Sequence, residues 1–208
     1  KKILAVYVSH PTVHEKNKPL FHDKDEKEVF YMNLFELIKR SAQGMKNIKS
    51  IVGTSMFVAL NCVLGFAKII IVPNTLEIQF STLAHAACAY TYGPVMAGFA
   101  GILTDTIKYF LNPSGPYMPF FAINEFITGF IYGCFFYKKK VTWPRVILAR
   151  LIVVLLLNLT LTPLWLHMMY GKAFIVYVQM RIVKNILMFP IDIFLLYSVL
   201  KATERAIP

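Results

Sequence analysis

The chain has 208 residues, of which 57% are hydrophobic and 16% are charged, so it is too apolar for a soluble domain of this size. Its formal net charge of +11 would suggest nucleic-acid binding in a soluble protein. In a membrane protein the position of each cation matters more than the total. The composition therefore predicts an integral membrane protein with no nucleic-acid partner.

Residues 1–31 mix Lys, Glu, Asp and His and carry no signal-peptide pattern. We expect a leader or an added extension here, with Met32 as a candidate native start. Residues 32–49 predict a basic amphipathic segment in the membrane interface. Its lipid-facing residues are Leu34, Phe35, Leu37 and Ile38, and its headgroup-facing cations are Lys39, Arg40 and Lys46.

Residues 50–203 predict the membrane domain, an all-α bundle of six transmembrane helices. A helix needs about 20 apolar residues to cross a bilayer. Five stretches have about that length, and a shorter sixth, Glu77–Tyr90, leads to the Gly93-Pro94 turn. The five are Ser50–Val72, Tyr92–Leu111, Pro119–Tyr137, Arg145–Leu166 and Ala173–Leu200.

Cations outside these stretches gather before the first, between the fourth and fifth, and after the last. Six crossings put all three groups on one side, which the positive-inside rule makes cytoplasmic, together with both termini. The groups are Lys39, Arg40, Lys46 and Lys49; Lys138, Lys139, Lys140 and Arg145; Lys201 and Arg205.

Polar residues within the stretches lie toward their outer ends. Each is costly in hydrocarbon and usually marks a pathway, a ligand or a partner. Spacings of three or four residues place each set on one helix face. The sets are Asn61, Gly65 and Lys68; Asp105, Lys108 and Tyr109; Asn124, Glu125 and Thr128; Arg181, Lys184 and Asn185. Together they predict one outward-facing polar cavity for an anionic ligand.

Structural interpretations of the same residues stay open. Lys68 and Lys108 can extend to the outer interface, Asp105 can pair with Lys108, and Glu125 can neutralise a cation of a neighbouring helix. Asp192 lies deeper, and its expected role is structural. The excess of cations in the outer half runs against the charge bias elsewhere, which favours a ligand.

The sequence carries no nucleophile elbow, Walker loop, zinc-protease motif or dinucleotide fingerprint. Cys62, Cys88 and Cys134 lack metal-ligand spacing and are expected to be small apolar fillers. His85 and His167 lack a paired ligand motif. The sequence therefore predicts no enzyme activity, no metal and no cofactor.

Several segments resemble the membrane-embedded substrate-binding (S) components of energy-coupling factor (ECF) vitamin transporters. The general likeness lies in Gly93–Gly98 leading to Thr104-Asp105, in Tyr109–Tyr117 and in Phe120–Gly133. The closing part is similar to the folate-specific branch through Leu164–Leu166, Tyr170–Lys172, Arg181–Asn185 and Pro190–Asp192.

The resemblance implies a high-affinity folate-binding, multi-pass protein of the bacterial plasma membrane. It implies docking on a membrane coupling subunit with two cytoplasmic ATPases, so that the partners hydrolyse ATP. Ser55 and Ala59, four residues apart, are small enough for close helix approach. In the family an alanine-xxx-alanine face of this helix meets the coupling subunit; here Ser55 replaces the first alanine. Packing of these residues inside the bundle is the alternative.

Folate gives the polar set a chemical interpretation. Its flat rings need aromatic walls, its pterin edge needs paired donors and acceptors, and its tail carries two carboxylates. The candidate walls are Phe66, Tyr109, Tyr117, Phe121 and Trp165. The candidates for the pterin edge are Asn61, Asp105, Asn124, Glu125 and Asn185. The candidates for the tail, or for balancing buried carboxylates, are Lys68, Lys108, Arg181 and Lys184.

Three other classes stay open. One is an S component for another vitamin, and a second is a stand-alone organic-anion transporter that needs no coupling proteins. The third is an intramembrane enzyme, for which Asp105 and Glu125 are the plausible acid-base pair.

Overall fold

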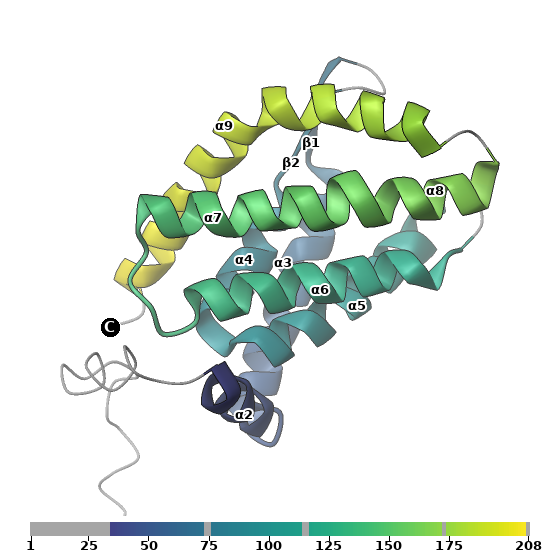
Figure 1. Cartoon of the computed structure of the whole chain (residues 1–208). Coiled ribbons are helices and arrows are strands. Elements are labelled where there is room, and N and C mark those ends of the chain that lie inside the picture. The colour runs from purple at the N-terminus through teal and green to yellow at the C-terminus, as the bar shows by residue number, and fades with distance from the viewer. Residues whose placement is uncertain (1–33, 73–75, 114–116, 172–173, 207–208) are drawn as a thin grey trace, which may run out of the picture.

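The computed structural model describes residues 34–72, 76–113, 117–171 and 174–206. This part of the chain forms seven helical segments, with a two-stranded hairpin at the edge of the bundle (Figure 1). They are α2 (Leu34–Gly44), α3 (Ile48–Phe66), α4 (Ser81–Tyr92), α5 (Pro94–Leu111), α6 (Pro119–Phe136), the continuous rod α7 (Trp143–Val153), η2 (Val154–Leu161) and α8 (Thr162–Tyr170), and α9 (Phe174–Ala206). The hairpin is β1 (Lys68–Val72) and β2 (Leu76–Gln79).

Proline marks the start of most of the long helices. It occupies the first turn of α5, α6, α7 and α8, where its fixed φ suits a helix and its missing N–H leaves no internal bond unmade. Gly93 separates α4 from α5 with φ +87°, a conformation that costs glycine little. These signals explain why the predicted bounds of α5 and α6 agree with the structure to within two residues.

The hairpin corrects two sequence predictions. Ser50–Val72 is not one helix, because α3 ends at Phe66 and Lys68–Val72 form a strand. Glu77–Tyr90 is helical only from Ser81 onward, because Glu77–Gln79 belong to β2, which pairs antiparallel with β1 before α4 begins. The run Ile69–Val72 is β-branched throughout, which favours a strand over a helix although its apolar length suits both.

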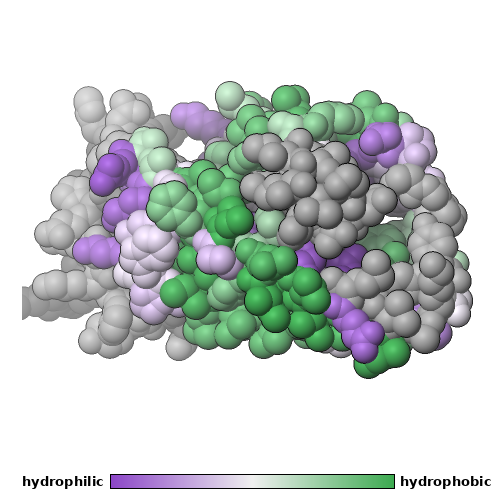
Figure 2. Space-filling model, turned by 90° about the horizontal axis from the view of Figure 1, so that it is seen from above, coloured by the Kyte–Doolittle hydropathy of each residue, from purple (hydrophilic) through white to green (hydrophobic). Residues whose placement is uncertain are grey.

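Among the described residues, four helical segments are long and apolar enough to cross a membrane: Ile48–Phe66, Pro119–Phe136, Trp143–Met169 and Arg181–Ala206. The surface of the bundle is correspondingly apolar across its middle, with polar residues toward its ends in the view of Figure 2. Many of its large hydrophobic side chains are exposed, for example Met56, Phe110 and Ile186. Such a belt matches a lipid environment, and the chain is a helical, multi-pass membrane protein.

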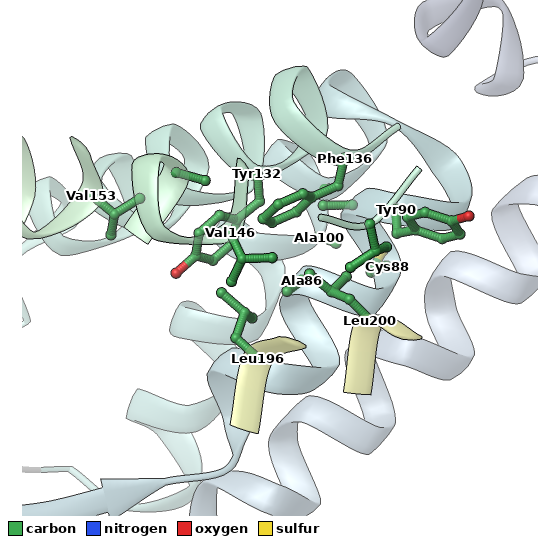
Figure 3. Close-up of a cluster of buried hydrophobic side chains, with 14 of the residues drawn as sticks. Ala86, Cys88, Tyr90, Ala100, Tyr132, Phe136, Val146, Val153, Leu196 and Leu200 are labelled. Carbon is green, nitrogen blue, oxygen red and sulfur yellow. The ribbon is translucent and has the colours of Figure 1, made fainter. Parts of the chain in front are cut away.

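Small and aromatic side chains fill the interior of the bundle (Figure 3). Ala86, Cys88, Ala89 and Ala100 let α4 lie close to its neighbours, while Tyr132 and Phe136 fill the remaining volume from α6. Cys62 and Cys88 are free and buried, as fillers would be. Because small residues allow backbones to approach closely in lipid, α4 becomes the buried central helix.

Helix α2, which the sequence predicts to lie in the membrane interface, is hydrogen-bonded to the turn between α4 and α5. Ser41 Oγ donates to Tyr92 O at 3.0 Å and accepts from Val95 N at 3.1 Å. Leu37 is 1% exposed and packs against protein, so its predicted lipid-facing position is wrong. Leu34 and Phe35 remain exposed, as an interfacial helix requires. The helix is therefore amphipathic, with part of its apolar face used for tertiary packing.

The basic connection between α6 and α7 folds back on the end of α6. Lys139 Nζ donates to Cys134 O at 2.9 Å, where a cation also compensates the helix dipole. Burial, together with the charge of Arg145, lowers the pKa of Lys139. This connection is thus an ordered part of the cationic side.

Candidate ligand-binding site

His85 of α4 lies between α5 and α6, where these two helices cross closely in the interior. A Cβ on Gly129 would lie 2.5 Å from His85 Nε2 and 2.6 Å from Ala97 O, so only glycine fits there. The imidazole is 2% exposed. Its Nε2 lies 2.9 Å from Ala97 O, and its Nδ1 lies 3.3 Å from Glu125 Oε2.

Glu125 is the acidic centre of this region. Its side chain is 47% exposed although it faces the buried His85, so the carboxylate has a free side. Asp105 of α5 lies near enough for the two carboxylates to interact electrostatically, and Lys108 acts on both. The arrangement combines two carboxylates with cations inside the bundle.

Lys108 crosses from α5 to α3. Its Nζ donates to Asn61 Oδ1 at 2.7 Å, and Asn61 is buried. The lysine stem passes over Gly65, where a Cβ would lie 2.6 Å from Lys108 Cε. The predicted grouping of Asn61 with Lys108 is therefore present as a direct contact.

A second polar group joins α6 to α8. Trp165 Nε1 donates to Asn124 Oδ1 at 3.1 Å, and Asn124 Nδ2 donates to Thr162 Oγ1 at 3.3 Å. The indole also stacks on Phe120, with ring centroids 4.4 Å apart and planes 12° from parallel. These contacts fix Trp165 as a flat, rigid surface beside a buried amide.

Tyr109 and Tyr117 form a separate aromatic group at the outer end of α5. Their ring centroids are 4.9 Å apart, and Tyr117 also stacks with Phe110 at 6.3 Å. Thr106 Oγ1 lies 3.4 Å from the Tyr117 hydroxyl. Tyr117 is thereby held against the helix that carries Asp105 and Lys108.

The polar face of α9 meets the π-helical segment η2. Asn158 Nδ2 donates to Asn185 Oδ1 at 3.0 Å, and Asn185 Nδ2 donates to Arg181 O at 2.8 Å. Arg181 and Lys184 are half-buried on the same helix. A helix-to-helix amide pair thus positions this part of α9.

Deeper in the bundle, Arg150 of α7 pairs with Asp192 of α9 and donates to the Tyr132 hydroxyl at 3.2 Å. Asp192 therefore has the structural partner that its depth suggested. Arg150 was not among the candidates, because a single arginine inside an apolar stretch gives no spacing signal. His85 was noted only for lacking a second ligand, and its partner Glu125 is 40 residues away in sequence.

Other predicted residues are placed less centrally. Phe66 is 57% exposed at the end of α3 and is not packed in the interior. Phe121 is half-buried on α6. Lys68 belongs to β1, so it does not share a helix face with Asn61, and its side chain lies outside the described part of the chain. Ser55 and Ala59 are exposed on α3, which contradicts packing inside the bundle.

Comparison with known proteins places this arrangement in a family. Residues 49–200 match the family model described as "ECF transporter, substrate-specific component". The "Folate transporter FolT" of Clostridium novyi (strain NT) is 33% identical over 162 residues, covering 77% of this chain and 93% of that protein. The "Folate transporter FolT" of Leuconostoc mesenteroides is 30% identical over 152 residues, covering 70% and 81%.

A solved structure has a fold similar to that of this chain. The crystal structure of FolT bound with folic acid superposes with a TM-score of 0.68 at 34% sequence identity, covering 75% of this chain and 95% of that chain. The likeness extends over nearly the whole of these proteins. Transport components, and not enzymes, make up the matching family. The chain therefore belongs to the substrate-specific components of ECF transporters.

Proposed function

We propose that this chain binds folate between α4, α5, α6, α8 and α9 and carries it across the membrane as the substrate-specific subunit of an ECF transporter. The observation that supports this most strongly is the 33–34% identity with proteins described as folate transporters or solved with folic acid. The local chemistry agrees, since flat aromatic surfaces lie beside buried amides, carboxylates and cations.

In this proposal each part of folate meets a different group. Trp165 stacks on the pterin, and Glu125 and Asp105 accept N–H bonds from its amine edge, for which a carboxylate is a strong acceptor. Asn124 orients Trp165 through the 3.1 Å bond to the indole. Lys108, Arg181 and Lys184 attract the anionic tail. Tyr109 and Tyr117 flank the entrance.

Fluorescence of Trp165 tests folate binding. The sequence has two tryptophans, and Trp143 stacks on Tyr197 at the opposite end of its rod, so Trp143→Phe leaves one reporter beside the proposed pterin position. We expect folate to quench this variant saturably at submicromolar concentration, and Trp165→Phe to abolish the signal. Tight binding of riboflavin or thiamine without folate binding would overturn the folate assignment and leave the family intact.

The membrane topology is part of the same proposal. Six crossings are formed by α3, α4 with the hairpin before it, α5, α6, the α7–α8 rod and α9, with both termini cytoplasmic. At about 1.5 Å per residue α4 alone spans roughly 18 Å, which is short for a bilayer. Reporter fusions after Ala206 should be active only as cytoplasmic reporters, and an active periplasmic or extracellular reporter there would contradict the topology.

Energised uptake is proposed to need a membrane coupling subunit and two ATPases that hydrolyse ATP. The exposed positions of Ser55 and Ala59 support α3 as the docking helix. Folate flux in liposomes without coupling proteins would instead favour a stand-alone transporter.

A further inference from the structure

The two ring nitrogens of His85 both face hydrogen-bond acceptors. Nε2 lies 2.9 Å from the carbonyl oxygen of Ala97, which has no proton to give, and Nδ1 lies 3.3 Å from Glu125 Oε2. A neutral imidazole carries one N–H and one lone pair. If the carboxylate is ionised and the imidazole is neutral, the ring nitrogen without a proton points its lone pair at an acceptor, which is unfavourable. The His85–Glu125 pair therefore carries one additional proton.

That extra proton lies either on the imidazole or on the carboxylate. The charges that act on Glu125 include those of Lys108 on α5 and Arg150 on α7, in addition to His85. Asp105 on α5, Tyr132 on α6 and Asp192 on α9 also interact with this network. A carboxylic acid is ordinarily a stronger acid than an imidazolium, so the proton is assigned to the ring.

We propose that His85 is an imidazolium that acts as a positioning residue, holding Glu125 as an anionic acceptor directed at the ligand. Ala97 O receives one ring N–H, Glu125 Oε2 receives the other, and the exposed part of the carboxylate accepts from the amine edge of a pterin. This role rests on the proposed folate function for its ligand, but the protonation state is a property of the ligand-free protein.

The close packing around the imidazole leaves it little room to rotate. The imidazole is 2% exposed and lies against Gly129 and Gly101, whose added Cβ atoms would be 2.5 Å from Nε2 and 2.9 Å from Cε1. It cannot rotate away from Glu125 without displacing α5 or α6. Loss of the ring proton would place a lone pair against the carboxylate and would turn Glu125 away from the ligand.

Nitrogen NMR of the ligand-free protein tests the protonation state directly. The chain has five histidines, so ¹⁵N-histidine labelling with His85→Gln as the assignment control isolates the two ring signals. We expect both nitrogens of His85 to show the shifts of protonated imidazolium nitrogens near neutral pH. One protonated and one bare nitrogen would overturn the proposal, whatever ligand the protein binds.

Ligand affinity tests the positioning role, with folate as the probe. Removing a hydrogen bond to a charged group costs roughly a factor of ten to a hundred, so we expect that loss in His85→Phe and partial recovery in His85→Gln, which can still donate.

Equal folate affinity of the wild type and His85→Phe would refute the positioning role. If His85→Phe fails to fold, the Gln comparison and the NMR result decide the question. If folate does not bind to the wild type at all, the proposed function fails while the NMR measurement still tests the imidazolium.

Discussion

Ionisable side chains inside the bundle take their roles from their partners. Arg150 pairs with Asp192 and donates to Tyr132 through its terminal nitrogens, while its buried Nε has no partner among the described residues, and its expected contribution is structural. Arg181 and Lys184 are half-buried on α9, beside the amide pair that joins this helix to η2. Their position, and not their charge alone, makes them candidates for the folate tail.

Truncation of these two cations tests their role in binding. If either one pairs with a ligand carboxylate or an acid of the site, Arg181→Ala or Lys184→Ala leaves a buried charge unpaired and should weaken folate binding by ~2–5 kcal/mol. Titration calorimetry measures the loss. Arg205→Ala, an exposed cation in the last turn of the same helix, is the matched control and should bind normally. Unchanged affinity in both test variants would remove this face of α9 from the site.

At the scale of helices, the α5–α6 crossing is the tightest constraint on the site. Gly129→Ala would place a methyl group 2.5 Å from His85 Nε2 and 2.6 Å from Ala97 O. Because a backbone carbonyl cannot move without shifting α5, we expect a loss of ~1–3 kcal/mol of stability, measurable as a lower Tm in detergent.

Gly44→Ala is the control for that substitution. Its added Cβ would be 3.9 Å from the nearest side-chain atoms, an ordinary contact distance, so the Tm should hardly change. A wild-type Tm for Gly129→Ala would mean that α5 and α6 can separate at little cost.

The Arg150–Asp192 pair joins α7 to α9. Removing one partner leaves the other charge buried, so Arg150→Met and Asp192→Leu should each destabilise the fold by ~3–5 kcal/mol. The double substitution removes both charges and should restore most of the stability. Thermal denaturation of the three variants checks this, and additive losses in the double variant would show that the two residues act independently.

The sequence predicted most helices of the membrane domain but not the hairpin. Gly93, Pro94 and Pro119 mark helix ends by their local backbone preferences. Ile69–Val72, in contrast, can be the end of the long apolar stretch Ser50–Val72 or a β-branched strand, and the sequence pattern fits both. Pairing with Leu76–Gln79 decides between them, and that is a tertiary event.

The site was predictable in its residue types and less so in its contacts. Helical spacing grouped Asp105 with Lys108 on α5, and both residues interact electrostatically with Glu125 in the structure. It also grouped Asn124 with Glu125 on α6, but Asn124 contacts Trp165 whereas Glu125 faces His85. It gave no sign that Trp165 bonds Asn124, 41 residues away, or that His85 faces Glu125, because contacts between helices depend on crossing angles and depths.

At the scale of the whole molecule, the exposed apolar surface includes two small side chains on α3. Ser55 and Ala59 are exposed on α3 among large residues such as Met56 and Val63, so they form a shallow strip where a partner helix can approach. The proposed docking of a membrane coupling subunit would use this strip.

A bulky residue on this strip separates binding from uptake. We expect Ala59→Trp to leave folate binding by the isolated protein intact, while blocking co-purification with the coupling subunit and folate uptake in cells. Leu148→Trp, on an exposed position of α7, is the control and should retain both. Normal uptake by Ala59→Trp would place the docking surface elsewhere.

The π-helical segment η2 has a consequence for how the rod from Trp143 to Tyr170 responds to changes in length. Thr160 and Thr162 hydroxyls donate to carbonyls five residues back, at 2.9 and 2.8 Å, and so reinforce the wider turn. A wider turn holds more residues per revolution than an α-helix and shifts the angular phase of everything after it. Trp165 reaches Asn124 only in that phase. Because a π-helical turn accommodates about one residue more than an α-helical turn, deleting one residue between Val154 and Leu161 would let the segment relax to α-helical winding and would leave the indole close to its present orientation.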